Sequence, residues 1–340
     1  MVDTMVEGRF AVVTGGGGFI GGHLVRRLLD EGYAVRAVDA KPVSEWYQVH
    51  DQVENLELNL EEKSACYQAT EGVDEVYNLA ADMGGMGFIE NNKALCMLSA
   101  LIGTHMLMAA RDLGVSQFFF SSSACVYAAD KQTDAHVTAL REEDAYPAMP
   151  EDGYGWEKLF TERMCRHFSE DFGLATRVAR FHNVYGPFGT YDGGREKAPA
   201  AICRKIAEAT LTGRREIEIW GDGEQTRSFM YIDDCVEGIR RLAESDVAEP
   251  INLGSSELVT INQLVTLVEG IAGITVERRY DLTAPQGVRG RNSDNTRIQD
   301  LLGWQPAISL LDGLTENYRW IHDELVQSGR FASAAGHLRD

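Results

Sequence analysis

A glycine-rich stretch near the N-terminus, VVTGGGGFIGGHL, constrains the fold more than any other part of the chain. It places Gly15, Gly18 and Gly21 between a short apolar run and a stretch with helical periodicity. In a strand–turn–helix unit, such glycines permit a tight turn, a close approach to a pyrophosphate and close helix–strand packing. The helix then directs its free N–H groups and positive dipole end at the phosphates. The stretch predicts a dinucleotide site, although its spacing is GxxGxxG and glycine-rich turns without a ligand are common.

The first half of the chain alternates strand-like and helix-like patterns, and this alternation predicts a Rossmann-type doubly wound parallel sheet with helices on both faces. We expect strands at 9–15, 33–39, 55–60, 74–81 and 117–123, with helices at 19–32 and within 88–113. Later segments read as helices at 154–173, 198–210, 231–245, 260–273 and 310–325, strands at 175–186, 216–220 and 250–256, and loops at 186–195 and 281–296. Asp233 or Asp234 is expected to cap the helix at 231–245.

Asp39 closes the second expected strand, 18 residues after Gly21. A carboxylate there accepts hydrogen bonds from the adenosine ribose and repels a 2′-phosphate, which selects NAD over NADP. A solvated surface Asp is the alternative, and nearby Lys41 weakens the preference for NAD. The residues expected to bind NAD come from the glycine turn, the strand ends and a Tyr–Lys pair: Gly15, Gly18, Phe19, Ile20, Gly21, Asp39, Asn59, Ala80, Ala81, Tyr154 and Lys158.

Tyr154 and Lys158 stand four residues apart in YGWEK and so share one face of the expected helix. A lysine ammonium and a positive nicotinamide ring both lower a tyrosine pKa from about 10, so Tyr154 becomes a usable base for a hydroxyl proton. Ser123, at the end of the strand at 117–123, can hydrogen-bond the same substrate oxygen. YxxxK alone occurs often by chance, and its weight comes from the glycine turn and the serine upstream.

The bulk composition excludes several classes of protein. The chain has 340 residues and a formal net charge of -20, which disfavours a nucleic-acid surface and attachment to anionic lipid. Its six cysteines form no CxxC pair and its histidines are scattered, so we expect no metal site and a reducing compartment. The N-terminus lacks a leader pattern, and no apolar run approaches the roughly 18 residues of a membrane span. These features predict a cytoplasmic protein without a membrane partner.

Together, the motifs resemble those of the extended short-chain dehydrogenase/reductase family, specifically its NAD-dependent nucleotide-sugar epimerases and dehydratases. The resemblance covers nearly the whole chain. Within the family it is sharpest to the enzymes that epimerise GDP-mannose at C3 and C5 through a 4-keto intermediate. It implies an isomerase that uses NAD, takes a nucleotide sugar and forms a homodimer. The stretches that carry it are NLAADMGGMGFIE, SSACVY, RFHNVYGPFGT, GGREKAPAA, WGDGEQTRSF and GVRGRNSDN.

The resemblance also implies that Cys125 and Lys197 are the acid/base pair that moves protons on carbon. A thiol suits this work because its pKa of about 8.5 leaves both protonation states within reach. Lys197 must be partly neutral, so a desolvated pocket or a nearby cation would have to lower its pKa. Alternatives are that Cys125 is a small apolar filler and that Lys197 is a surface or phosphate-binding lysine.

Substrate contacts are expected mainly from cations, because an acidic chain must concentrate its positive charge where a diphosphate binds. The candidates are Lys205, Arg227, Arg289 and Arg291, each of which could instead be a solvated charge. Asn183 resembles the substrate-positioning Asn of the family, and Glu196 and Gln225 are candidates for sugar hydroxyls. Gly84, Gly85 and Met86 lie in a loop, 82–88, that is either a lid over the sugar or a plain connection.

Several sequence features leave the substrate open. Asn59 stands where the family often has Asp, and Trp156 stands where smaller aliphatic residues are familiar and is expected to reshape the sugar pocket. We predict an NAD-binding domain over 1–180, with returning segments from about 225–255, and a substrate lobe mainly over 181–340. The alternatives are a single-site epimerase (C3, C5 or C4) of another nucleotide-linked hexose or heptose and a non-catalytic NAD-binding scaffold. A 4,6-dehydratase usually needs an Asp–Glu pair where this chain has Ala124 and Cys125.

Overall fold

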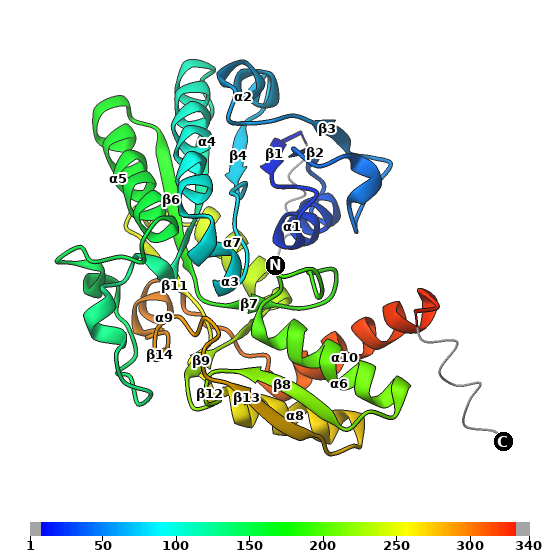
Figure 1. The fold of residues 1–340 in the computed structure, drawn as a ribbon. Helices are drawn as coiled ribbons and strands as arrows, with labels where there is room; N and C mark the ends of the chain where they lie inside the picture. Colours follow the sequence, from blue (N-terminus) through cyan, green and yellow to red (C-terminus); the bar gives the residue numbers. More distant parts are fainter. Residues whose placement is uncertain (1–7, 331–340) are drawn as a thin grey trace.

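Seven strands of the chain form one parallel sheet in the order β11-β6-β5-β4-β1-β2-β3 (Figure 1). The structure is a computed structural model that describes residues 8–330. The predicted doubly wound sheet is confirmed, and its order reverses between β1 and β4. The strands are β1 (Phe10–Thr14), β2 (Ala34–Asp39), β3 (Glu54–Glu57), β4 (Glu75–Asn78), β5 (Gln117–Ser123), β6 (Ala175–Phe181) and β11 (Ile251–Leu253).

Helices cover both faces of this sheet because its inner strands are apolar on both sides. Along β1, Val12 joins one buried cluster, whereas Ala11 and Val13 join the other. The cluster that contains Val12 lies under α2 (Lys63–Thr70), α4 (Lys93–Asp112) and α5 (Tyr154–Phe172). The opposite cluster lies under α1 (Phe19–Asp30) and α7 (Ile232–Ala243). Side chains of alternating direction on one strand thus hold the two helical layers to the sheet.

A second group of elements packs beyond the carboxyl ends of the strands and fills the lower part of Figure 1. It contains the parallel pair β8 and β13, and β9 between β12 and β14. The bounds are β7 (Val184–Tyr185), β8 (Glu216–Trp220), β9 (Thr226–Ser228), β10 (Met230–Tyr231), β12 (Leu258–Thr260), β13 (Glu277–Asp281), β14 (Gly290–Arg291), α6 (Ala198–Thr212), α8 (Ile261–Ala272), α9 (Thr296–Leu302) and α10 (Leu310–Gln327). The predicted returning stretch contains α7 and β11, whereas the division at residue 180 stays a prediction.

Three local predictions need correction. The helix expected within 88–113 is two helices, α3 (Met86–Asn91) and α4, because the chain leaves the helical conformation at Asn92. Neither Asp233 nor Asp234 caps α7: the N-cap is Tyr231, and Asp234 instead accepts hydrogen bonds from the backbone N–H groups of Ala307 and Ile308. The loop expected at 281–296 contains the short strand β14.

Helix α4 also corrects the expectation that no segment is apolar enough to span a membrane. It has 20 residues and contains an 18-residue window with a mean hydropathy of 1.4, which meets that test by length and composition. In the fold it connects β4 to β5, and 44% of its apolar window is buried against the rest of the protein. The N-terminal residues 1–7, part of the stretch in which we see no leader pattern, lie outside the described residues.

Candidate active site

The glycine turn lies at the point where the strand order reverses, between the carboxyl ends of β1 and β4. Gly15 has a φ of +70°. Gly18 is the N-cap of α1 and, as a glycine, has no side chain that could hydrogen-bond the helix end. At Gly21, any Cβ would overlap the Gly15 carbonyl oxygen. The turn is therefore closed by glycines, and the first turn of α1 presents N–H groups that no side chain caps. This is the arrangement in which doubly wound folds bind the pyrophosphate of a dinucleotide.

The edges of this turn also suit NAD. Ala80 packs directly on Gly15, and Thr14 Oγ1 accepts hydrogen bonds from the N–H groups of Leu79 and Ala80, both at 3.1 Å. Asp39 ends β2, and its carboxylate accepts a hydrogen bond from the Lys41 N–H at 3.0 Å. The Lys41 ammonium donates to the Gly17 carbonyl at 2.9 Å. The Lys41 ammonium therefore binds a backbone carbonyl of the glycine turn, and the contact of Asp39 with a ribose stays a prediction.

The remaining predicted NAD contacts surround the turn. Phe19 and Ile20 are half-buried in the first turn of α1, and Ala81 is half-buried after β4. Asn59 is exposed, and its side-chain oxygen accepts a hydrogen bond from the Glu61 N–H at 3.1 Å. The small residues and the uncapped helix end fit a bound NAD, whereas the contact of Asn59 with NAD stays a prediction.

Tyr154, Lys158 and Ser123 meet where β5 ends and α5 begins. Tyr154 is the first residue of α5, and Ser123 is the last residue of β5. Lys158 is almost fully buried, with its ammonium 5.4 Å from the centroid of the Tyr154 ring and 4.8 Å from that of Phe120. Burial raises the pKa of Tyr154 well above its ordinary value, and Ser123 opposes this rise. The protein alone therefore does not produce the lowered tyrosine pKa that we expected from Lys158.

A pocket of about 430 Å³ opens beside this trio. Its walls are the carboxyl ends of β5 and β6, the segment 83–89, the start of α6, and residues of β8, β9 and β14. It contains most of the residues predicted to touch substrate. Those are Gly84, Gly85, Met86, Ser123, Cys125, Tyr154, Asn183, Glu196, Lys197, Lys205, Gln225, Arg227 and Arg291.

Cys125 and Lys197, the predicted acid/base pair, line this pocket from different elements. Cys125 lies in the short 3-10 turn after β5, and its N–H donates to Ser123 Oγ at 3.2 Å. Burial raises the pKa of its thiol to about 11. Lys197 is the N-cap of α6, and burial lowers its pKa. The protein thus favours a protonated thiol and a lysine with a larger neutral fraction.

Arg291 occupies an unexpected place. It was predicted to bind the diphosphate, but its Nη1 donates to Cys125 Sγ at 3.4 Å and its Nε to Gln132 Oε1 at 2.6 Å. Its Nη2 lies 3.6 Å from Glu151 Oε2. The arginine is 6% exposed and is therefore part of the environment of the thiol. The sequence did not single out Glu151 or Gln132, since neither has a spacing that distinguishes it from an ordinary loop residue.

The other predicted cations differ in what they pair with. Arg227 donates to the carbonyl oxygens of Thr226, Gln286 and Val288, and burial followed by the Arg291 charge lowers its pKa to about 9. Lys205 donates to the Glu218 carbonyl oxygen at 2.7 Å. Arg289 does not line the pocket: it forms a bidentate pair with Asp222 at 2.8 and 3.0 Å at the surface. The nearby carboxylate thus accounts for Arg289 without a phosphate.

Neutral groups complete the pocket. Asn183 donates to the Ser228 carbonyl oxygen at 3.1 Å. Gln225 donates to the Trp220 carbonyl oxygen, and its own side-chain oxygen is buried with no hydrogen-bond partner in the described part of the chain. The Glu196 carboxylate accepts from the Gly194 N–H and from Arg204. Arg204, which the sequence did not mark, is neutralised by the carboxylates around it.

The predicted lid residues line the pocket, and Trp156 lies elsewhere. The N–H of Gly85 donates to the Arg195 carbonyl oxygen at 3.0 Å, and Met86 lies against Gly287. Trp156 is exposed on α5 and does not line the pocket. The expectation that it reshapes the sugar pocket is wrong, because the face of α5 that carries it is opposite the face that buries Tyr154 and Lys158.

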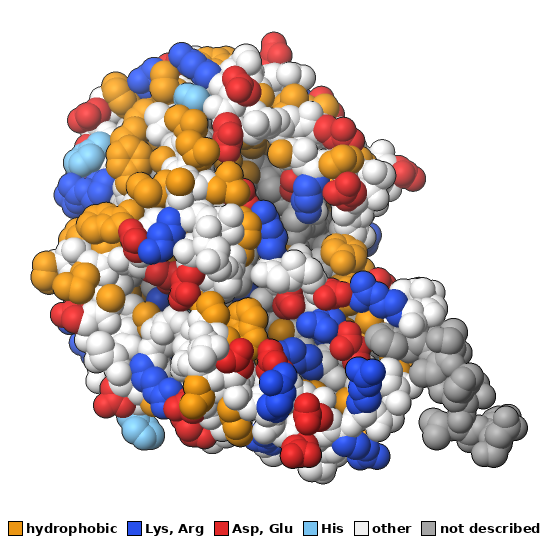
Figure 2. Space-filling view, viewed as in Figure 1, with side chains coloured by type: hydrophobic (Ala, Val, Ile, Leu, Met, Phe, Trp, Pro, Cys, Tyr) orange, Lys and Arg blue, Asp and Glu red, His pale blue; other side chains and the backbone are white. Residues whose placement is uncertain are grey.

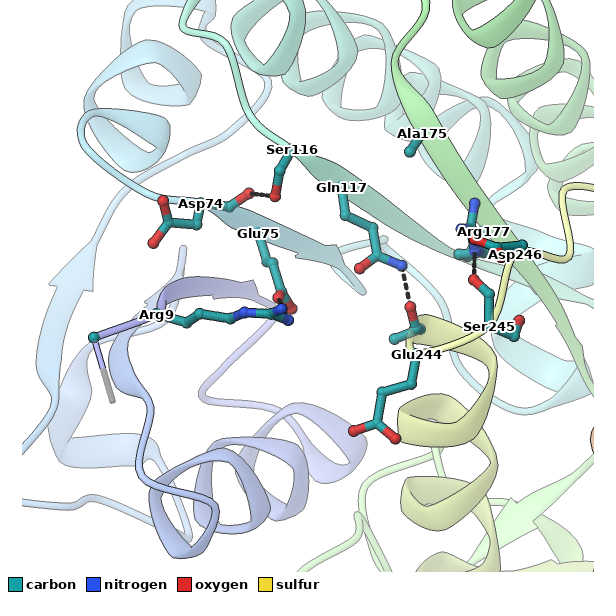
Figure 3. Close-up of a pocket in the computed structure, with 12 residues that line it drawn as sticks. Arg9, Asp74, Glu75, Ser116, Gln117, Ala175, Arg177, Glu244, Ser245 and Asp246 are labelled. Carbon is teal, nitrogen blue, oxygen red and sulfur yellow. Dashed lines mark hydrogen bonds and ion pairs between the residues drawn. The ribbon is translucent and has the colours of Figure 1, made fainter. Parts of the chain in front are cut away.

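A second hollow lies at the opposite, amino-terminal edge of the sheet (Figure 3). Its polar groups already bind one another: Ser116 Oγ donates to the Asp74 carbonyl, and Arg177 Nε donates to the Ser245 carbonyl at 2.6 Å. It is far along the strands from the glycine turn and from the trio of Tyr154, Lys158 and Ser123. The chemistry therefore gathers at the carboxyl edge, as expected for a doubly wound sheet.

Known proteins resemble this chain over most of its length. The chain is 48% identical over 324 residues to GDP-mannose 3,5-epimerase 1 of Oryza sativa subsp. japonica, a match that covers 92% of this chain and 82% of that one. It is 47% identical over 320 residues to GDP-mannose 3,5-epimerase of Arabidopsis thaliana, with the same coverage.

Solved structures show the same fold. UDP-glucose 4-epimerase of Thermotoga maritima, with UDP-glucose, has a TM-score of 0.83 at 27% identity and covers 93% of this chain and 99% of its own. UDP-glucuronic acid 4-epimerase of Bacillus cereus, in complex with UDP-glucuronic acid and NAD, has a TM-score of 0.80 at 25% identity with the same coverage.

A family model for NAD dependent epimerase/dehydratase proteins matches residues 11–254. This stretch runs from β1 to the residue after β11, so it takes in nearly all of the large sheet, the glycine turn and the Tyr–Lys pair. Because this model covers most of the chain and a relative is 48% identical over 92% of it, the chain belongs to the NAD-dependent epimerase/dehydratase family.

Proposed function

We propose that the protein epimerises GDP-mannose at C3 and C5 through a 4-keto intermediate. The observation that carries this proposal is the pocket in which Ser123 and Tyr154 of the trio share the wall with both a thiol, Cys125, and a lysine, Lys197. A trio alone would serve oxidation and reduction at C4. An additional acid/base pair is needed to move protons on the flanking carbons. The identity of about 48% to enzymes named for this reaction supports GDP-mannose as substrate.

Oxidation at C4 begins with loss of the hydroxyl proton, which Tyr154 accepts while Ser123 hydrogen-bonds the oxygen. When bound, NAD supplies the acceptor and later the donor of the C4 hydride, and its positive ring favours the tyrosinate. The buried ammonium of Lys158, which lies 5.4 Å from the centroid of the Tyr154 ring, adds a second positive charge near the tyrosine. Glu157, whose carboxylate lies 3.6 Å from that ammonium, holds the lysine in place.

Proton transfer on carbon uses Lys197 and Cys125. A ketone at C4 acidifies the C–H bonds at C3 and C5. Because burial lowers the pKa of Lys197, its neutral amine takes a proton from carbon, and the electron pair moves to the ketone oxygen as an enolate. Because burial raises the pKa of Cys125 to about 11, the thiol retains a proton to deliver to the opposite face. Reduction at C4 then returns a hydroxyl group at that carbon.

Substrate binding is assigned to Arg227 and Lys205 for the diphosphate, since both donate only to carbonyl oxygens in the described chain and keep their positive charge available. Asn183 and the free oxygen of Gln225 are assigned to polar groups of the sugar nucleotide.

A label experiment tests the proposal. The purified protein is incubated with GDP-mannose in deuterated water, and deuterium at each sugar carbon is measured by NMR and mass spectrometry. We expect label at C3 and C5 and none at C4, because carbon-bound protons exchange through the side chains while the C4 hydride is retained. Label at one carbon would establish a single-site epimerase, and no label would exclude GDP-mannose as the substrate.

We also propose that the protein is a cytoplasmic homodimer. Helices α4 and α5 carry an apolar face whose large side chains are between 38% and 49% exposed: Leu95, Met97, Leu98, Leu101, Trp156 and Phe160. Figure 2 shows apolar side chains gathered over this part of the molecule. A second copy suits this face better than anionic lipid, because the chain has a net charge of -20. The six free, buried cysteines are consistent with a reducing compartment.

A further inference from the structure

Glu151 is a half-buried carboxylate beside Cys125 that the reaction, as derived above, does not use. It lies in the loop before α5, and its N–H donates to the Cys125 carbonyl oxygen at 2.9 Å. Its Oε2 lies 3.6 Å from Arg291 Nη2, and its Oε1 is buried with no hydrogen-bond partner among residues 8–330. Burying an unpaired carboxylate oxygen in this way is costly unless the charge of the group acts on something nearby.

Arg291 connects this carboxylate to the thiol. Gln132, 2% exposed, fixes the guanidinium through the bond to Nε, and Gln132 itself donates to the Tyr127 and Ala128 carbonyl oxygens. The planar guanidinium then directs Nη1 at Cys125 Sγ and Nη2 toward Glu151. One cation is thus shared between a thiol and a carboxylate, and a change in either acceptor alters the electrostatic environment of the other.

We propose that Glu151 is a positioning residue that keeps Cys125 protonated. It does so through its own negative charge and by competing with the sulfur of Cys125 for the Arg291 guanidinium. This inference deepens the proposed function. An enzyme that exchanges protons at two carbons must restore its acid/base pair between them. After Cys125 gives its proton to carbon, it is a thiolate, and Lys197 is an ammonium. The thiolate regains a proton from water as the ammonium loses one to water. The negative charge of Glu151 favours the protonated thiol at this step.

The charges around the thiol support the assignment. Glu151 raises the pKa of Cys125, whereas Arg291 lowers it. The other charged or titratable groups whose fields couple to the thiol are Tyr154 on α5, Lys197 at the start of α6 and Arg227 on β9. Among all the groups named in this paragraph, Glu151 is the carboxylate. Its removal therefore shifts the balance toward the thiolate, and removal of Arg291 shifts it toward the thiol.

The test is the rate at which iodoacetamide alkylates Cys125 in the NAD-bound protein without any sugar nucleotide, measured from pH 7 to 10 by mass spectrometry of the Cys125 peptide. The thiolate is the reactive form. In Glu151→Gln, an isosteric change, we expect alkylation at pH 8 to be about tenfold faster than in the unmodified protein, as for a one-unit fall in thiol pKa. In Arg291→Gln we expect it to be slower. Cys125→Ser identifies the signal.

Glu151→Asp is the matched control, because it keeps the charge and shortens the side chain. We expect its alkylation profile to stay close to that of the unmodified protein. A structural role for Glu151 predicts the reverse: an Asp variant at least as perturbed as the Gln variant. An unchanged profile in Glu151→Gln, or shifts of the same sign in Glu151→Gln and in Arg291→Gln, would overturn the proposal. Since no substrate is present, these outcomes are independent of whether GDP-mannose is epimerised.

Discussion

At the scale of single residues, His182 shows how burial beside the site makes stability depend on pH. It follows β6, directly before Asn183, and its Nε2 lies 3.1 Å from Asn252 Oδ1. Burial lowers its pKa from 6.5 to about 3. Between these values the unfolded chain binds a proton that the folded protein does not, so this residue makes the protein lose stability as pH falls from 6.5 toward 3.

Replacing His182 should remove that dependence. In His182→Gln, whose amide can still donate to Asn252, we expect the free energy of unfolding to fall less steeply with decreasing pH, by as much as about 1.4 kcal/mol per pH unit. Urea unfolding at pH 4 to 7 measures it. His136→Gln, at an exposed position, is the control and should keep the slope of the unmodified protein. Equal slopes in all three proteins would mean that His182 is protonated in the fold.

At the scale of elements, the first turn of α1 is built for glycine. A methyl group at Gly21 would overlap the Gly15 carbonyl oxygen, so Gly21→Ala must push α1 away from β1. We expect at least tenfold weaker NAD binding by calorimetry and a loss of stability of about 1–3 kcal/mol. Gly270, within α8, has open space around its Cβ position, so Gly270→Ala should stabilise the protein by about 0.5–1 kcal/mol with NAD affinity unchanged. Similar effects of both changes would refute this explanation of the turn.

The elements also show what the sequence could and could not reveal. Strand β1, helix α1 and helix α5 were predictable because their periodicity and glycine boundaries are local signals. Strands of two or three residues, such as β9 and β14, are too short to display a period. Asp234 could not be assigned, because its partners Ala307 and Ile308 are more than 70 positions away. The same holds for Arg291, whose place beside Cys125 depends on a contact across 166 positions. An arginine in a loop suggested a phosphate contact, whereas its position in the fold indicates a contact with the thiol.

At the scale of the whole molecule, the apolar face of α4 and α5 is the feature that a single copy leaves unexplained. Helical spacing brings Met97 and Leu101 to one side of α4, and Trp156 and Phe160 to one side of α5. The two helices pack against each other, so these exposed side chains lie on neighbouring helices. Two copies joined through this surface would bury it in a four-helix contact, while the pockets remain at the carboxyl edge of each sheet.

Leu101→Glu tests this arrangement, because a carboxylate at the centre of a dry contact is left without a partner. We expect light scattering after gel filtration to give about twice the 37.6 kDa chain mass for the unmodified protein and the mass of one chain for Leu101→Glu, with unchanged far-UV circular dichroism. Leu282→Glu introduces the same charge at a more exposed leucine after β13 and should remain dimeric. A monomeric unmodified protein would refute the dimer. If that monomer then bound neutral vesicles in a flotation experiment, the result would indicate a lipid partner for the apolar face of α4.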